Sequence, residues 1–103
     1  MALIKDIAQI CKSKNAGPFS VTVDVLFEDH ELYQKVKATG VLNAELVGAL
    51  YNVDPAKVLF TPYDTASAFK MTFPRAISAG DIGDTDVYGA QQHAPMLTVD
   101  IPL

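Results

Sequence analysis

The segment from Phe19 to Phe27 alternates between apolar and polar side chains and constrains the fold more than any other part of the chain. One face of its two-residue repeat carries Phe19, Val21, Val23, Val25 and Phe27. The opposite face carries Ser20, Thr22, Asp24 and Leu26. This pattern predicts a β-strand with one buried face and one partly solvated face, which requires a sheet with its core on one side.

The size of the chain limits it to one such core. Its 103 residues are 50% apolar and 19% charged. A chain of this length buries about two-thirds of its unfolded surface, enough for a stable fold without a disulfide or a structural metal. We therefore expect a single domain over residues 1–103.

Helix signals follow the alternating segment. The predicted N-caps are Asp29, Asn43 and Asp54. The first helix runs to about Ala38 and ends at Gly40, and the second covers residues 44–51. The third start has Pro55 at its first helical position and predicts a single turn.

The N-terminal segment also has helical spacing. Apolar residues from Leu3 to Lys12 recur at intervals of three and four, which predicts a helix that docks on the sheet. Cys11 lies in this segment and, as the single cysteine, is expected to be a small buried thiol. Gly17 and Pro18 then break the period and predict a turn over residues 13–18.

The C-terminal half predicts a hairpin and a final strand. Strands over residues 58–61 and 68–73 flank a turn at residues 62–65, and alternation returns from Met96 to Ile101. Residues 75–95 show no stable period. The expected fold is α+β, a four-stranded, mainly antiparallel sheet with helices packed on one face in a ferredoxin-like sandwich.

Charge and the N-terminal sequence exclude several classes of protein. Eight basic residues against twelve acidic ones give a net charge of -4, the wrong sign for a protein that grips nucleic acid. Lys5 and Asp6 interrupt any apolar signal region, so we expect a cytoplasmic protein. Charges recur too often for a membrane span.

The segment from Ala79 to His93 holds the best candidates for chemistry. It contains three glycines, Tyr88, a histidine and five acceptor or amide side chains, Asp81, Asp84, Asp86, Gln91 and Gln92. The aspartates with His93 form one possible metal-ligand set, although such loops usually hold themselves together through Asp side chains that bond nearby amides. Alternatively, His93 acts as a general acid or base, or simply packs within the loop. His30, by contrast, is expected in an exposed first helical turn.

A second candidate site binds anions. Lys12 and Lys14, with Asn15 and a glycine-containing turn, can bind a carboxylate or a phosphate, or can form a solvated turn. Arg75, the only arginine, follows Pro74 at the start of the long segment. It can clamp a carboxylate through two hydrogen bonds or pair with an aspartate.

Two motifs go beyond these physical patterns. SKNAGPF at residues 13–19 and GDTDVYGAQQHAP at residues 83–95, joined by VTVDVLF, resemble the domain of unknown function 4387 family of small bacterial proteins. The resemblance implies no particular reaction or cofactor. Members of this family occur beside, or fused to, proteins similar to the acyclic terpene utilisation protein AtuA, whose larger chains end in a small ferredoxin-like domain.

The resemblance implies a small subunit of a two-component enzyme that breaks down organic acids or their thioesters with an AtuA-like large chain. The motif positions carried into a shared site are His93, Tyr88, Asp86 and Asp84 as candidate catalysts, and Lys14, Asn15, Gln91 and Gln92 as binding residues. Arg75 joins the binding set on its chemistry alone. Two alternatives stay open: a non-catalytic module that pairs with copies of itself, and a stand-alone lyase or isomerase for small carboxylic acids.

Overall fold

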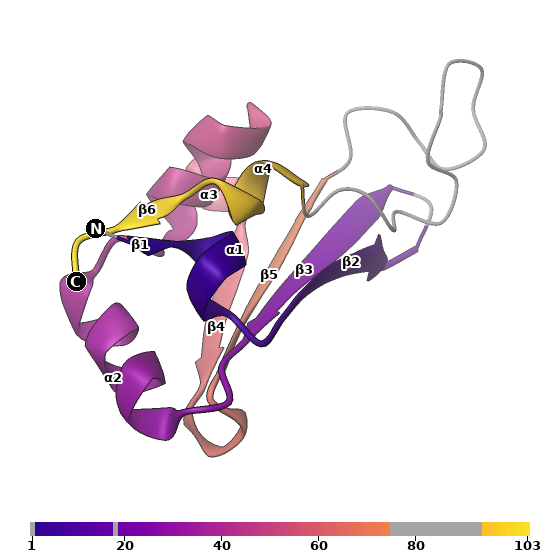
Figure 1. The fold of residues 1–103 in the computed structure, drawn as a ribbon. Helices are drawn as coiled ribbons and strands as arrows, with labels where there is room; N and C mark the ends of the chain where they lie inside the picture. The colour runs from indigo at the N-terminus through magenta and orange to yellow at the C-terminus, as the bar shows by residue number, and fades with distance from the viewer. Residues whose placement is uncertain (1, 18, 75–93) are drawn as a thin grey trace.

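An antiparallel sheet of four strands, with helices packed on it, forms the framework of the protein (Figure 1). The computed structural model describes residues 2–17, 19–74 and 94–103. The elements in chain order are β1 (Ala2–Leu3), α1 (Ile4–Ile7), β2 (Ile10–Asn15), β3 (Ser20–Leu26), α2 (His30–Thr39), α3 (Ala44–Tyr51), the short 3-10 helix η1 (Pro55–Lys57), β4 (Leu59–Tyr63), a second 3-10 helix η2 (Asp64–Ala66), β5 (Ala68–Pro74), α4 (Ala94–Leu97) and β6 (Asp100–Ile101). The predicted α+β class is confirmed.

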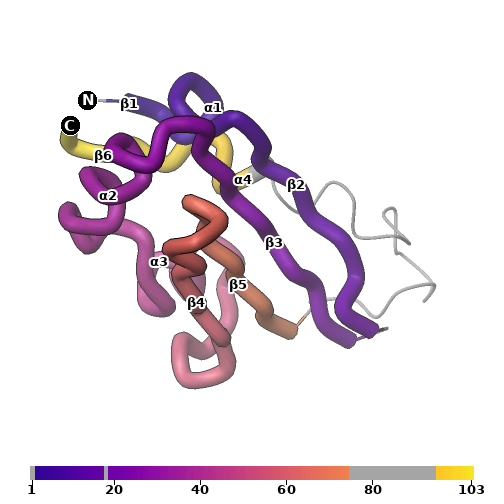
Figure 2. The backbone as a smooth tube through the Cα atoms, turned by 90° about the horizontal axis from the view of Figure 1, so that it is seen from below, coloured from indigo at the N-terminus to yellow at the C-terminus, as the bar shows by residue number. Residues whose placement is uncertain are grey.

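The strand order in this sheet is β2-β3-β5-β4, and every neighbouring pair is antiparallel. Figure 2 shows the four strands following one another in this order. Helices α2 and α3 connect β3 to β4, and β5 lies between these two strands in the sheet. This split connection is the crossover of ferredoxin-like folds. Strands β1 and β6 pair with each other in a separate two-stranded sheet.

The central predictions from local signals are confirmed. Strand β3 occupies the alternating segment, and the side chains of Asp29, Asn43 and Asp54 each accept a hydrogen bond from a backbone amide at the start of their helices. Gly40 ends α2 with a φ of 69°, a left-handed conformation that glycine adopts without steric cost. The predicted hairpin is the β4–β5 pair, with η2 as its turn.

The predicted N-terminal helix is wrong beyond its first turn. Helix α1 ends at Ile7, Ala8 is extended, and residues 10–15 form the edge strand β2. The apolar spacing alone does not decide between a helix and a strand. A turn with Gly17 at a φ of 90° brings this segment back along β3. Six residues then pair with β3, and this tertiary pairing overrides a weak helical pattern.

The predicted C-terminal strand is also mostly wrong. Residues 94–97 form the short helix α4, and only Asp100 and Ile101 are strand, paired with β1 rather than with the main sheet. Met96, Val99 and Ile101 are all buried, an uneven spacing that a single strand does not produce. The fourth strand of the main sheet is β2 instead.

One face of the sheet carries the hydrophobic core. Val21, Val23 and Val25 of β3 lie opposite Phe73, Met71 and Phe69 of β5, and all six are buried. The other elements cover this face with Ile4, Tyr33, Val36, Leu42, Val47, Met96, Val99 and Ile101. Phe19 is 68% exposed, because it precedes β3 beyond the end of this core.

Candidate functional site

Most of the predicted site residues lie outside the described part of the chain. They are Arg75, Asp84, Asp86, Tyr88, Gln91, Gln92 and His93, together with Asp81 of the possible metal set. Lys14 and Asn15 are described, as is Lys12. The structure therefore locates the end of β5, from which the candidate loop starts, and two of the proposed binding residues, Lys14 and Asn15.

The first motif and the segment that leads to the second motif start at the same end of the sheet, while the second motif ends in α4. Ser20, the first residue of β3, pairs with Pro74, the last residue of β5. The turn between β2 and β3 closes beside them, where the backbone amide of Ala16 donates to the carbonyl oxygen of Ser20 at 2.9 Å. Residue 75 therefore follows directly from a strand end adjacent to the first motif.

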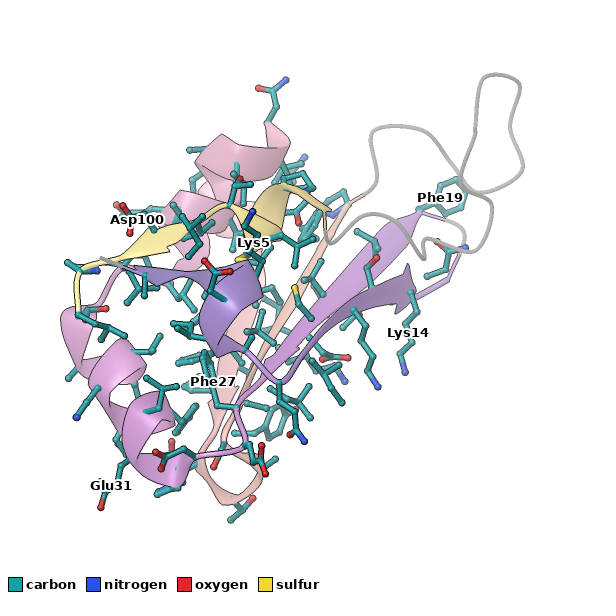
Figure 3. All side chains as sticks on the ribbon, viewed as in Figure 1. Lys5, Lys14, Phe19, Phe27, Glu31 and Asp100 are labelled. Carbon is teal, nitrogen blue, oxygen red and sulfur yellow. The ribbon has the colours of Figure 1, made fainter. Side chains whose placement is uncertain are left out.

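Lys14 and Asn15 project from opposite faces of β2. Lys14 lies opposite Thr22 on the face without the core and is exposed, while Asn15 lies opposite Val21 on the core face and is half-buried. Figure 3 shows Lys14 directed away from the helices and Phe19 at the far end of the sheet. The predicted turn over residues 13–18 is thus wrong as far as Asn15, because the strand extends to that residue.

This alternation separates the anion-binding candidates. Lys12 and Lys14 share one face, so an anion there can contact both ammonium groups. The side chain of Asn15 lies on the other face, at the end of the sheet where residue 75 begins. A ligand can therefore contact either the two lysines or Asn15. It can contact the lysines and Asn15 together only at the end of the strand.

Aromatic and thiol groups also line the core face of the sheet. The rings of Tyr51 and Phe73 lie 4.3 Å apart between centroids, and Cys11 is half-buried on the same face of the sheet. Burial, followed by the charge of Asp24, raises the pKa of Cys11 to about 11. Burial also raises the pKa of Tyr51, with a further contribution from Cys11. Both groups are therefore neutral at pH 7, which favours the predicted structural role of Cys11 over a nucleophilic one.

A polar cluster that the sequence did not reveal joins α2 to η2. The hydroxyl of Tyr33 donates to Asp64 Oδ1 at 2.6 Å, and Lys37 Nζ donates to the same oxygen at 2.9 Å. These bonds lower the pKa of Asp64, with Tyr33 as the largest cause. Burial, followed by the hydrogen bond to Asp64, raises the pKa of Tyr33. The pair therefore holds its proton on the tyrosine.

His30 and Ser67 extend this connection. His30 Nδ1 lies 2.8 Å from Ser67 Oγ, and Gln34 Nε2 lies 3.2 Å from His30 Nε2. These contacts fasten α2 to the β4–β5 turn. As expected, His30 is exposed in the first turn of α2.

The sequence indicates only the α2 residues of this cluster and not their partners. His30 and Gln34, like Tyr33 and Lys37, are four residues apart and share a helix face. Their partners Asp64 and Ser67 are more than twenty residues further along the chain, with no motif that marks the pairing.

Comparison with known protein families identifies the chain. The family model described as Domain of unknown function (DUF4387) matches residues 4–100. The chain belongs to this family. The DUF4387 match includes the second motif and nearly every described element. Searches of curated proteins and of solved structures give no significant match.

Two further searches covered the described part of this DUF4387 protein. No helix there is long and apolar enough to cross a membrane. Within residues 2–17, 19–74 and 94–103, no three His, Cys, Asp or Glu side chains are grouped as metal ligands. The metal set predicted from the aspartates and His93 lies in the undescribed segment and stays a prediction.

Proposed function

We propose that this DUF4387 protein is the small subunit of a two-component enzyme that acts on organic acids or acyl thioesters together with an AtuA-like large chain. The observation that supports it is that the first family motif and the segment leading to the second start at one end of the sheet, where Ser20 pairs with Pro74. Motifs far apart in the sequence can then contribute to one site.

In this proposal the two chains divide the work. The large chain holds most of the substrate, and the small chain supplies polar groups from its end of the sheet. Asn15, Arg75, Gln91 and Gln92 bind the carboxylate or thioester oxygen, and Lys14 adds positive charge nearby. Because the chain has a net charge of -4, these cations are needed to attract an anionic substrate locally.

Acid–base chemistry in the proposal is assigned to the second motif. His93 transfers the proton, since an imidazole titrates near neutral pH, and Tyr88 acts as a hydroxyl donor. Asp84 and Asp86 orient these groups as hydrogen-bond acceptors. The described titratable groups on the core face of the sheet, Cys11 and Tyr51, have raised pKa values and leave this role to the motif.

Co-expression with an AtuA-like chain encoded beside this one tests the proposal. The two chains should purify as a stable complex, and turnover of acyl thioesters or organic acids should need both. In the complex, Lys14→Ala should lower kcat/KM for an anionic substrate, whereas Lys5→Ala in α1 removes the same charge and should leave it unchanged. Failure of the chains to associate would overturn the proposal.

A non-catalytic module that pairs with itself is the competing hypothesis. It is favoured by the apolar side chains exposed on the face of the sheet opposite the core, including Leu59 at 66%. The two hypotheses separate in the same experiment, because the module requires self-association and no turnover in the presence of the large chain.

A further inference from the structure

The face of the sheet opposite the core carries an unusual share of exposed apolar surface. Five large hydrophobic side chains are exposed in the described part of the chain, and Ile10, Leu59 and Tyr63 are on this face. The described helices pack on the other face, where the buried residues of β3 and β5 form the core. These side chains lie on the two edge strands, Ile10 on β2 and Leu59 and Tyr63 on β4, at the rim of this face, where a partner that spans the sheet can bury them.

The strand register arranges this open face in rows that run across the sheet. The first row is Ile10, Leu26, Ala68 and Tyr63. The second row is Lys12, Asp24, Lys70 and Thr61. The third row is Lys14, Thr22, Thr72 and Leu59. In each row the two inner residues belong to β3 and β5, and the outer ones to the edge strands β2 and β4.

These rows complement themselves when they are reversed. A two-fold axis parallel to the strands and midway between β3 and β5 places a second copy face to face, with each row matched to its own reverse. Asp24 then faces Lys70 of the second copy, and Lys70 faces its Asp24. Ile10 faces Tyr63, Thr22 faces Thr72, and Lys14 covers Leu59 with its aliphatic stem.

We propose that this open face is the interface of a symmetric homodimer in which Asp24 and Lys70 of the two copies form reciprocal ion pairs. Both side chains are half-buried, and the one ion pair formed among the described residues is Lys37–Asp64, so Asp24 and Lys70, although neighbours across β3 and β5, form no ion pair with each other or with another described residue. The extra cations, Lys12 and Lys14, are on edge strand β2, where their ammonium groups reach solvent at the rim.

The β4 edge of the sheet disfavours the alternative of edge-to-edge pairing there. Pro62 lies in the middle of edge strand β4 and offers no backbone amide to an added strand. Packing of two open faces buries Leu59 and Tyr63 without requiring hydrogen bonds from this edge. Two sheets packed in this way have their faces about 10 Å apart, as in other sheet-on-sheet cores.

This interface does not depend on the two-component proposal. The large chain is assigned to the sheet end where Ser20 pairs with Pro74, whereas the dimer uses the face around Asp24. Lys14 is used in both proposals, whereas Asp24, Lys70 and Tyr63 belong to the dimer alone and report on it separately. Failure of the dimer therefore does not imply failure of the two-component proposal.

Sedimentation equilibrium of two charge-reversal variants tests the interface. The wild-type chain should have twice the mass of one chain. Asp24→Lys places lysines opposite each other, and Lys70→Asp places aspartates opposite each other, so each variant alone should raise the dimer dissociation constant at least about tenfold. An equimolar mixture of the two should regain wild-type affinity, because every facing pair is then of opposite charge. No rearrangement within one chain produces this recovery.

A second pair of variants covers the case in which a charge reversal prevents folding. Tyr63→Asp should dissociate the dimer by placing a carboxylate against Ile10, and circular dichroism should show that the chain stays folded. Leu103→Asp is the matched control, since Leu103 is 49% exposed, outside the main sheet, and should not change the mass. A monomeric wild type, dimers unaffected by Tyr63→Asp, or soluble Asp24 and Lys70 variants that fail to recover on mixing would each overturn the proposal.

Discussion

The two faces of the main sheet are built from the same strands and yet have opposite physical characters. On β5, Phe69, Met71 and Phe73 are fully or almost fully buried, while Lys70 and Thr72 between them are only partly covered. On β3, the valines alternate with Asp24, which is partly covered, and with Thr22, which is 3% exposed. One face therefore supplies most of the apolar burial of the monomer, whereas in our proposal the other is used for association.

Truncation of an aromatic core residue should cause the largest loss of stability and so separate the two faces most clearly. Phe69 is 1% exposed, and its ring contacts those of Phe27, Tyr33 and Phe60. Phe69→Ala should lower the free energy of unfolding by about 3–5 kcal/mol, measured by urea denaturation. Leu59→Ala on the open face should cost less than about 0.5 kcal/mol in the monomer. Equal losses for the two variants would contradict the assignment of the faces.

The reactivity of Cys11 tests whether this residue of the edge strand β2 lies on the core face of the sheet. The raised pKa of Cys11, about 11, reduces its thiolate fraction at pH 8 by about a hundredfold relative to an ordinary cysteine. Alkylation by iodoacetamide should therefore be about a hundredfold slower in the folded chain than in urea. A folded chain that reacts as fast as the unfolded one would show that Cys11 is not on the covered face.

A smaller effect is expected from the polar pair at the centre of the open face. The hydroxyls of Thr22 and Thr72 lie 3.0 Å apart, and Thr22 is 3% exposed. Thr22→Val should cost about 1 kcal/mol in urea denaturation, because the Thr72 hydroxyl loses its partner. Replacement of both threonines by valine should cost less than the sum of the single variants. Strict additivity would show that this hydrogen bond does not contribute to stability.

The smallest effect concerns pH and the cluster that fastens α2 to η2. Because folding lowers the pKa of Asp64, its contribution to stability is present above its ordinary pKa of ~3.9 and is lost as the pH falls through the lower folded value. Asp64→Asn should lower the urea midpoint at pH 7, and the difference from wild type should shrink on acidification. Glu28→Gln, which removes the same charge from an exposed site, should not reproduce this pH dependence. A difference that grows on acidification would contradict the assignment.

Local signals in the sequence were sufficient where the residues themselves fix the backbone. Asp29, Asn43 and Asp54 cap their helices as predicted, since each supplies its own oxygen to the amides of the following turn. The alternation in β3 identified the central strand and its buried face. For the candidate site, the sequence selected a first motif that closes beside the strand end from which the segment leading to the second motif starts, but Lys14 and Asn15 are strand residues on opposite faces.

Predictions failed where long-range pairing decided between two local possibilities. Residues 10–15 have neither a strong helical nor a strong strand pattern, and their hydrogen bonds to β3 make them a strand. Met96 to Ile101 alternate well enough for a strand, yet the burial of Met96 and Val99 against the core bends the segment into a helical turn first.

The sequence by itself determined the α+β class, the helix boundaries at their caps and the one-sided character of β3, because these depend on neighbouring residues. Only the tertiary structure decided that β2 fills the edge of the sheet and that Asp24 lies between Lys12 and Lys70. It also brought Tyr33 and Lys37 to Asp64. Such contacts join residues far apart in the chain, and their register follows from how the whole sheet buries its apolar face.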